Sequence, residues 1–121
     1  MEWLGSQGYV VFYPIGHSPD IDLIADDGRT LRRVQVKTTT QWRGNRWEVT
    51  LCTRGGNRSW SGLVKHFNGS RCDSLFVLVA DGRRWFVPAD AVTAGSKIVL
   101  GGPKYAMYEV EPGRPLASER T

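Results

Sequence analysis

Short apolar runs alternate with polar turn sequences along most of the chain, a pattern that predicts strands joined by tight turns. Residues 9–13 are aromatic and β-branched and precede Pro14, so we expect a strand there. A second strand is expected over 20–25 and a third over 30–39, joined by the Asp-Asp-Gly turn at 26–28. These two strands should therefore form a hairpin. Alternation over 47–53 predicts a further strand.

Helical spacing replaces this alternation at residues 57–67. Behind a capping residue at 57 or 59, four apolar residues recur at helical intervals: Trp60, Leu63, Val64 and Phe67. We predict a helix there, and residues 2–7 fit the last turns of an earlier helix that ends at Gly8. The apolar run over 75–80 is typical of a buried strand. The Asp-Gly turn at 81–82 leads into another strand over 84–87, and a last strand is expected within 105–110.

This order of elements predicts an α/β or α+β fold, in which a mixed central sheet is flanked by helices. The 121 residues are enough for one domain, which we place at residues 1–110. Residues 111–121 are rich in proline, glycine and charge and offer little apolar surface, so we expect them to form a loose tail.

Composition favours a polyanionic partner and argues against a zinc-binding, secreted or membrane-spanning protein. Sixteen Lys and Arg against twelve Asp and Glu give a net charge of +4, which suits nucleic acid. Cys52 and Cys72 have neither CxxC spacing nor a nearby histidine pair, so they indicate buried thiols and not a zinc site. Neither a secretory leader nor a run of about 18 apolar residues is visible, so we expect a cytoplasmic protein that does not enter a membrane.

Polar residues are unusually placed on the two strands of the predicted hairpin. Alternate side chains of a strand share a face, so Asp20 and Asp22 point the same way, as do Gln35 and Lys37. Because the strands are neighbours, carboxylate, amide oxygen and ammonium can converge on one surface. A simpler interpretation is that the aspartates are solvated strand-edge residues paired with Lys37, and that Gln35 faces outward.

The convergence supplies what phosphodiester hydrolysis needs: oxygen ligands for a hard cation and positive charge beside the phosphate. Asp22 would bind Mg²⁺ through its carboxylate, Gln35 through its side-chain carbonyl oxygen, and Val36 through its main-chain carbonyl. Lys37 would orient the attacking water or stabilise the phosphate. We expect Mn²⁺ to substitute for Mg²⁺.

The order Pro19-Asp20-x-Asp22, hairpin, Gln35-Val36-Lys37 resembles the motif of PD-(D/E)XK nucleases. It is most similar to the Gln-x-Lys branch, which holds intron-encoded homing endonucleases, and it also resembles archaeal-type Holliday junction resolvases. The resemblance extends over about residues 4–92 and implies a restriction-endonuclease-like αβββαβ core with, here, a short first helix.

Carried over by position, the resemblance implies a catalytic set on five residues. The family's metal-binding aspartate falls on Asp22, with Asp20 as its competitor, its second acidic position on Gln35, and its lysine on Lys37. The family's helix glutamate has only Glu2 as a counterpart, and Glu2 lies closer to Gly8 than the family pattern expects.

Basic residues interleaved with tryptophans follow the hairpin. In one interpretation they form a solvated basic face and the tryptophans anchor the core. In the other, loops 43–46 and 54–58 grip successive phosphates and Trp42 stacks on an unpaired base. On that view the DNA-binding residues are Ser18, Thr39, Trp42, Arg43, Arg46, Arg54, Arg58 and Lys65, and Arg71 lies in the same basic stretch.

The function expected from these observations is a Mg²⁺-dependent DNA endonuclease that acts as a homodimer, since cutting two strands needs two sites. Branched DNA is the first expected substrate, because a short chain has little room for a sequence-reading module. Alternatives are homing or restriction-like cleavage of duplex DNA, a DNA-binding module that keeps the fold without efficient cleavage, and a protein-interaction domain.

Overall fold

The computed structural model describes residues 2–16, 21–51, 53–54, 64–65, 72–93 and 96–113. Short strands dominate these residues, as the turn-rich sequence predicts. In chain order the elements are α1 (Glu2–Ser6), β1 (Val10–Phe12), β2 (Leu23–Asp26), β3 (Leu31–Thr39), β4 (Trp42–Arg43), β5 (Arg46–Thr50), β6 (Thr53–Arg54), β7 (Val64–Lys65), β8 (Ser74–Val79), β9 (Arg84–Pro88), the 3₁₀ helix η1 (Ala89–Ala91), β10 (Lys97–Leu100), the 3₁₀ helix η2 (Ala106–Tyr108) and β11 (Glu109–Val110).

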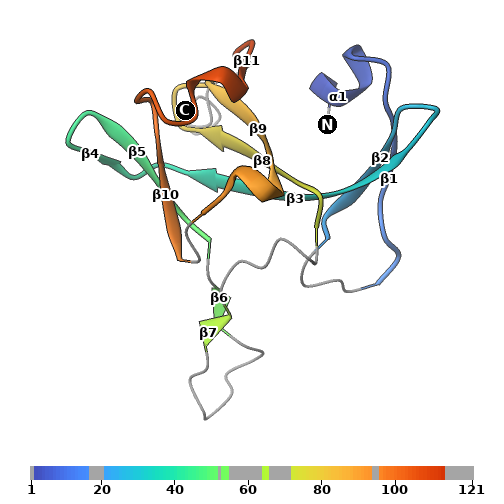
Figure 1. Cartoon of the computed structure of the whole chain (residues 1–121), viewed down its shortest axis with the longest axis horizontal. Coiled ribbons are helices and arrows are strands. Elements are labelled where there is room, and N and C mark those ends of the chain that lie inside the picture. The colour runs from blue at the N-terminus through green and yellow to red at the C-terminus, as the bar shows by residue number, and fades with distance from the viewer. Residues whose placement is uncertain are drawn as a thin grey trace, which may run out of the picture.

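A mixed six-stranded sheet in the order β1-β2-β3-β8-β9-β11 forms the body of the molecule (Figure 1). β3 and β8 run parallel, whereas the other neighbours are antiparallel. The predicted hairpin is confirmed as β2 and β3. Its turn is closed by two aspartates, because Asp26 accepts the N–H of Gly28 and Asp27 accepts those of Arg29 and Thr30.

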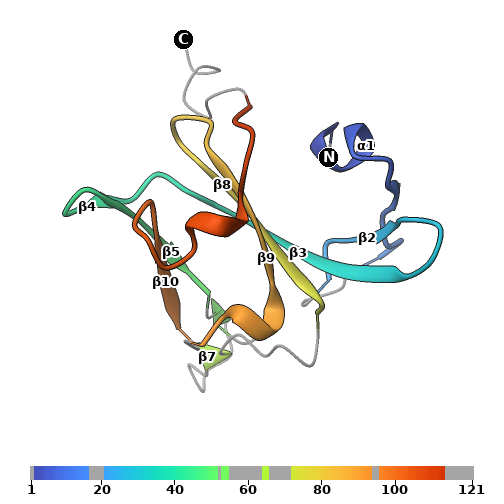
Figure 2. The same ribbon diagram turned by 45° about the horizontal axis from the view of Figure 1, so that its top comes forward.

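Each face of this sheet buries its own apolar cluster. Helix α1 brings Leu4 to the first face, against Leu23, Val34 and Phe76. The opposite face is covered by a three-stranded sheet, β10-β5-β4. Its Val49, Ile98 and Leu100, together with Leu51 just after β5, pack on Leu75, Val77 and Trp85 of the larger sheet. Figure 2 shows α1 beside β1 and β2 at one end of the molecule and β4, β5 and β10 at the other. The α+β class and the mixed sheet are confirmed, but within the described residues a sheet, and not a helix, covers the second face.

The helix predicted over 57–67 is wrong at the two of its residues that the structure describes. Val64–Lys65 is extended and pairs antiparallel with Thr53–Arg54. Its remaining positions, Trp60 among them, lie outside the described residues. Apolar spacing could not reveal a strand whose main-chain partners lie ten and twelve residues earlier.

The loop predicted at 43–46 is instead a tight hairpin turn between β4 and β5, with Trp42 opposite Trp47 and Arg43 opposite Arg46. Gly44 (φ 57°) and Asn45 (φ 66°) both have positive φ, as a type I′ turn requires. Trp47 lies in the core, as one interpretation of the tryptophans predicted.

Of the tail predicted over residues 111–121, the structure describes residues 111–113. Glu111 accepts a hydrogen bond from Arg84 through its carbonyl, and the N–H of Gly113 donates to the carbonyl of Gly82. Residues 114–121 lie outside the described residues, as does Cys52, whereas Cys72 is buried as predicted. No helix in the described parts of the chain is both long and apolar enough to cross a membrane.

Candidate active site

The two strands of the central hairpin have unequal length, so β3 continues past the start of β2. We call the point where they part, with Asp22 on one side and residues 34–37 of β3 on the other, the fork. β2 pairs with β3 from Leu23 opposite Val34 to Asp26 opposite Leu31. β3 continues to Thr39 with β8 as its partner, and Figure 1 shows this long strand crossing the molecule. Asp22 stands just before β2, where its N–H donates to the carbonyl of Val34 (2.8 Å). This hydrogen bond holds Asp22 at the point where β3 extends beyond β2.

The side chain of Asp22 is fixed by the main chain of β3. Its Oδ2 accepts the N–H of Val36 at 2.6 Å. In an extended strand the N–H and C=O of one residue point to the same side, so the carbonyl of Val36 faces the same edge as the Asp22 carboxylate. Two oxygen ligands expected from the sequence are therefore directed to one place at the fork.

Gln35 and Lys37 flank Val36 and point to the face opposite α1. Their partners on β8 are Leu75 and Val77, which belong to the core on that face. Gln35 is only 9% exposed, so it is not the outward-facing residue of the simpler interpretation. Lys37 is half-buried. No ion pair joins the Asp22 and Lys37 side chains, both of which the structure describes, so the paired-surface interpretation is not supported for Asp22.

The composition of this cluster fits Mg²⁺ better than zinc. The candidate donors expected from the sequence are one carboxylate, one side-chain amide and one main-chain carbonyl, all oxygen ligands of the kind that magnesium takes alongside water and substrate oxygens. The described parts of the chain contain no group of three or more His, Cys, Asp or Glu side chains that could hold a metal ion.

Other candidates for catalysis are not brought to the fork. Glu2 forms an ion pair with Arg84 (3.3 Å), whose side chain is buried. Arg84 shares its strand face with Phe86, which packs on the α1 side of the sheet. The structure thus places Glu2 on the face opposite Gln35 and Lys37. Asp20 lies outside the described residues.

A residue pair that the sequence analysis missed lies next to the fork. Arg33 precedes Gln35 by two positions and shares its face. Asp73 accepts hydrogen bonds from the Arg33 main-chain N–H (2.7 Å), Nε (3.2 Å) and Nη2 (3.1 Å). The Arg33 guanidinium holds the pKa of Asp73 below its ordinary value. The pair fastens the start of β3 to the start of β8. The alternation that puts Arg33 on the same face as Gln35 could have pointed to Arg33. Its partner Asp73, however, lies forty residues later in the chain.

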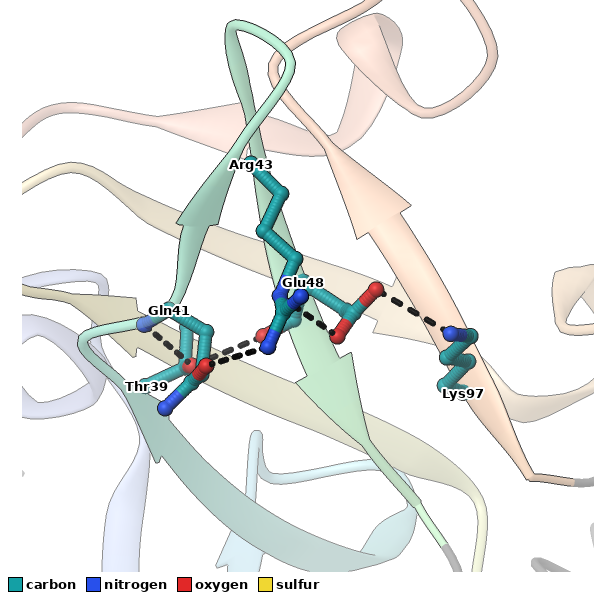
Figure 3. Close-up of polar contacts among 5 residues, drawn as sticks. All are labelled: Thr39, Gln41, Arg43, Glu48 and Lys97. Atoms are coloured by element: carbon teal, nitrogen blue, oxygen red, sulfur yellow. Dashed lines mark hydrogen bonds and ion pairs between the residues drawn. The ribbon is translucent and has the colours of Figure 1, made fainter.

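The predicted DNA-binding residues fall into three groups. Trp42, Arg43 and Arg46 lie on the small sheet, where Trp42 is exposed and meets Trp47 edge-on (centroids 4.8 Å apart). Thr39 is buried, and its hydroxyl donates to the Glu48 carbonyl (2.7 Å) and accepts the Gln41 N–H (3.1 Å), so it has a structural role (Figure 3). The third group lies outside the described structure. The structure does not describe Ser18, Arg58 or Arg71, and of Arg54 and Lys65 it describes only the main chain.

Comparison with known proteins agrees with this geometry. A family model described as PD-(D/E)XK endonuclease matches residues 1–104. Among solved structures, the bacterial homing endonuclease I-Ssp6803I is similar, with a TM-score of 0.74 and 22% identity over 89% of this chain and 79% of that one. At this identity the likeness shows the fold. No curated protein matches the chain.

Proposed function

Because this chain belongs to the PD-(D/E)XK endonuclease family, we propose that it is a Mg²⁺-dependent enzyme that hydrolyses phosphodiester bonds in DNA. One observation carries the proposal. The carboxylate of Asp22 is tied to the main chain of Val36 at the fork, between Gln35 and Lys37. The Val36 main chain that holds this carboxylate and the ammonium group of Lys37 thus belong to adjacent residues of β3, which supports the proposal.

Each residue of the fork has a distinct task in the proposed reaction. Asp22, Gln35 and the Val36 carbonyl would hold Mg²⁺, which when bound supplies Lewis-acid stabilisation of the phosphate and lowers the pKa of a bound water. The Val36 N–H keeps the carboxylate oriented. Burial restricts the rotamers of Gln35. Lys37, which carries donors only, would donate to a phosphate oxygen or to the attacking water.

Branched DNA is the substrate that we propose first, because the order of the motif residues resembles that of junction resolvases. Duplex DNA is the second candidate, favoured by the similarity to a homing endonuclease. We further propose a homodimer, since two sites allow both strands to be cut. Sedimentation of the purified protein tests this, and a monomer in the presence of DNA would refute it.

Cleavage assays with three DNA forms test the proposed activity. Supercoiled plasmid, linear duplex and a four-way junction are incubated with protein and Mg²⁺, Mn²⁺ or EDTA. We expect product with either metal and none with EDTA, and the preferred form identifies the substrate class. Shifted bands without metal-dependent product would instead identify a binding module that keeps the nuclease fold. If the protein neither binds nor cleaves any of the three DNA forms, a role in nucleic-acid chemistry is refuted.

A further inference from the structure

The small sheet and the fork face the same side of the molecule. β10-β5-β4 packs on the face of the larger sheet that carries Leu75 and Val77, and Gln35 and Lys37 point to that face. The outer surface of the small sheet therefore looks away from the larger sheet in the direction in which Lys37 points. Thr39 links the two, because it lies about 7 Å along β3 from Lys37 and hydrogen-bonds the main chain of Glu48.

Positive charge gathers on this outer surface. We define the basic face as Arg43, Arg46, Lys97 and Lys104. Lys97 follows the alternation of β10, opposite to the buried Ile98. The side chain of Arg43 is 69% exposed and that of Lys97 is 56% exposed. Among the described residues, Glu48 is the carboxylate that forms ion pairs with these cations.

Glu48 sits between two of these cations and draws them together. Its carboxylate lies 3.5 Å from Arg43 Nε and 3.1 Å from Lys97 Nζ, and Figure 3 shows all three side chains on one face of the sheet. Ion pairs this exposed contribute little to stability, at most about 1 kcal/mol. Their effect is to order two long cationic side chains while leaving their outer surface exposed.

Beside this pair, the surface is hollowed into a recess of about 400 Å³. Three of the residues that line it are cationic, Arg46, Lys97 and Lys104, and Val99 and Tyr105 also line it. Gly102 leaves room for the Arg46 guanidinium, since a Cβ there would stand 2.5 Å from Arg46 Nε. Cationic groups around a shallow hollow match a chain of phosphates, which presents one charge about every 3.4 Å along each strand of DNA.

We propose that the basic face binds the DNA backbone beside the cleavage site, with Lys97 and Lys104 as phosphate contacts. The inference rests on the proposed function, because it takes DNA as the substrate held at the fork. Its contribution is to affinity and placement, and carries no sequence preference.

Salt-dependent DNA binding tests the basic face. Anisotropy of a labelled duplex is measured in EDTA from about 0.05 to 1 M salt, for wild type, Lys97→Gln, Lys104→Gln and the double variant. Each lost phosphate contact makes the slope of log affinity against log salt shallower by about 1. If the affinities converge near 1 M salt, the double variant binds roughly 60-fold more weakly at about 0.1 M.

Two further variants control for folding and for net charge. Glu48→Gln should bind DNA more tightly than wild type, because it removes the carboxylate from the basic face, and a folding defect could not raise affinity. Arg29→Gln removes one charge from the exposed β2–β3 turn, at the end of the molecule away from β10 in Figure 1. It should leave the salt slope within about 0.3 of wild type, since no contact to DNA is lost.

The outcomes separate this inference from the proposed function. An unchanged slope and affinity in the double variant, or an equal loss with Arg29→Gln, would overturn the basic face even if the wild type cleaves DNA. Conversely, a wild type that yields no product with Mg²⁺, yet loses affinity through Lys97→Gln and Lys104→Gln, would overturn the nuclease proposal and leave the binding face standing.

Discussion

Replacing Asp22 with asparagine separates the charge at the fork from its geometry. The amide oxygen of asparagine can still accept the Val36 N–H, so the hydrogen bond changes from charge-assisted to neutral. That change costs about 1 kcal/mol at this exposed position, which lowers the Tm by about 3–6 °C for a chain of this size. The proposed metal loses its carboxylate ligand. If this removes about 4 kcal/mol of transition-state stabilisation, cleavage slows by about 10³-fold.

A matched control comes from the same strand. Asp26 also accepts a main-chain N–H, that of Gly28 at 2.8 Å, but lies at the far end of β2. Asp26→Asn should therefore lower the Tm by a similar amount and leave the cleavage rate within about twofold of wild type. Single-turnover plasmid cleavage in saturating Mg²⁺ and thermal unfolding measure the two effects. Cleavage by Asp22→Asn within tenfold of wild type would refute the assignment, and a selective loss in Asp20→Asn would move the metal ligand to Asp20.

Substitutions at three more positions probe the neighbourhood of the fork. Gln35→Glu should lower the Mg²⁺ concentration for half-maximal cleavage by about tenfold, because a carboxylate binds this cation more tightly than an amide; an unchanged Mg²⁺ titration would argue against Gln35 as a ligand. Lys37→Ala should slow single-turnover cleavage by about 10²–10³-fold while DNA affinity in EDTA changes little, and Lys37→Arg should recover part of the rate; equal losses of binding and cleavage would contradict a role in the chemical step. Asp73→Asn should lower the Tm at neutral pH. Because the folded pKa of Asp73 is lowered, mainly by its hydrogen bond to Arg33, its stabilisation is complete above the ordinary aspartate pKa of about 3.9 and is lost as the pH falls through the folded pKa. The Tm difference from wild type should therefore shrink in acid, and a constant difference would refute the linkage.

The hairpin of β2 and β3 could be predicted because all of its signals are local. The Asp-Asp-Gly turn and the alternation of Gln35 and Lys37 lie within twenty residues, and side-chain direction in a strand follows from backbone geometry alone. The positive φ angles at Gly44 and Asn45 were also within reach, since Gly-Asn is a hairpin sequence.

What the sequence could not reveal depends on distant partners. β10 joins β5 across about fifty residues, with Lys97 opposite Thr50, and the alternation of four residues between glycines was too short to identify it. The burial of Gln35 is decided by β8. The hydroxyl of Thr39 is a group that can bind a phosphate, but here it donates a hydrogen bond to the main-chain carbonyl of Glu48. At each position a nonlocal contact determined the role of the side chain.

Position 36 holds Asp22 through its main chain alone, while its side chain packs against the apolar cluster on the α1 face. Its contribution to the fork comes from peptide groups, which every amino acid except proline carries in full. Drift among β-branched residues at position 36 would leave the aspartate oriented, whereas proline would remove the donor and release it. The proposed chemistry therefore constrains the side chains at positions 35 and 37, but at position 36 it depends only on the peptide groups.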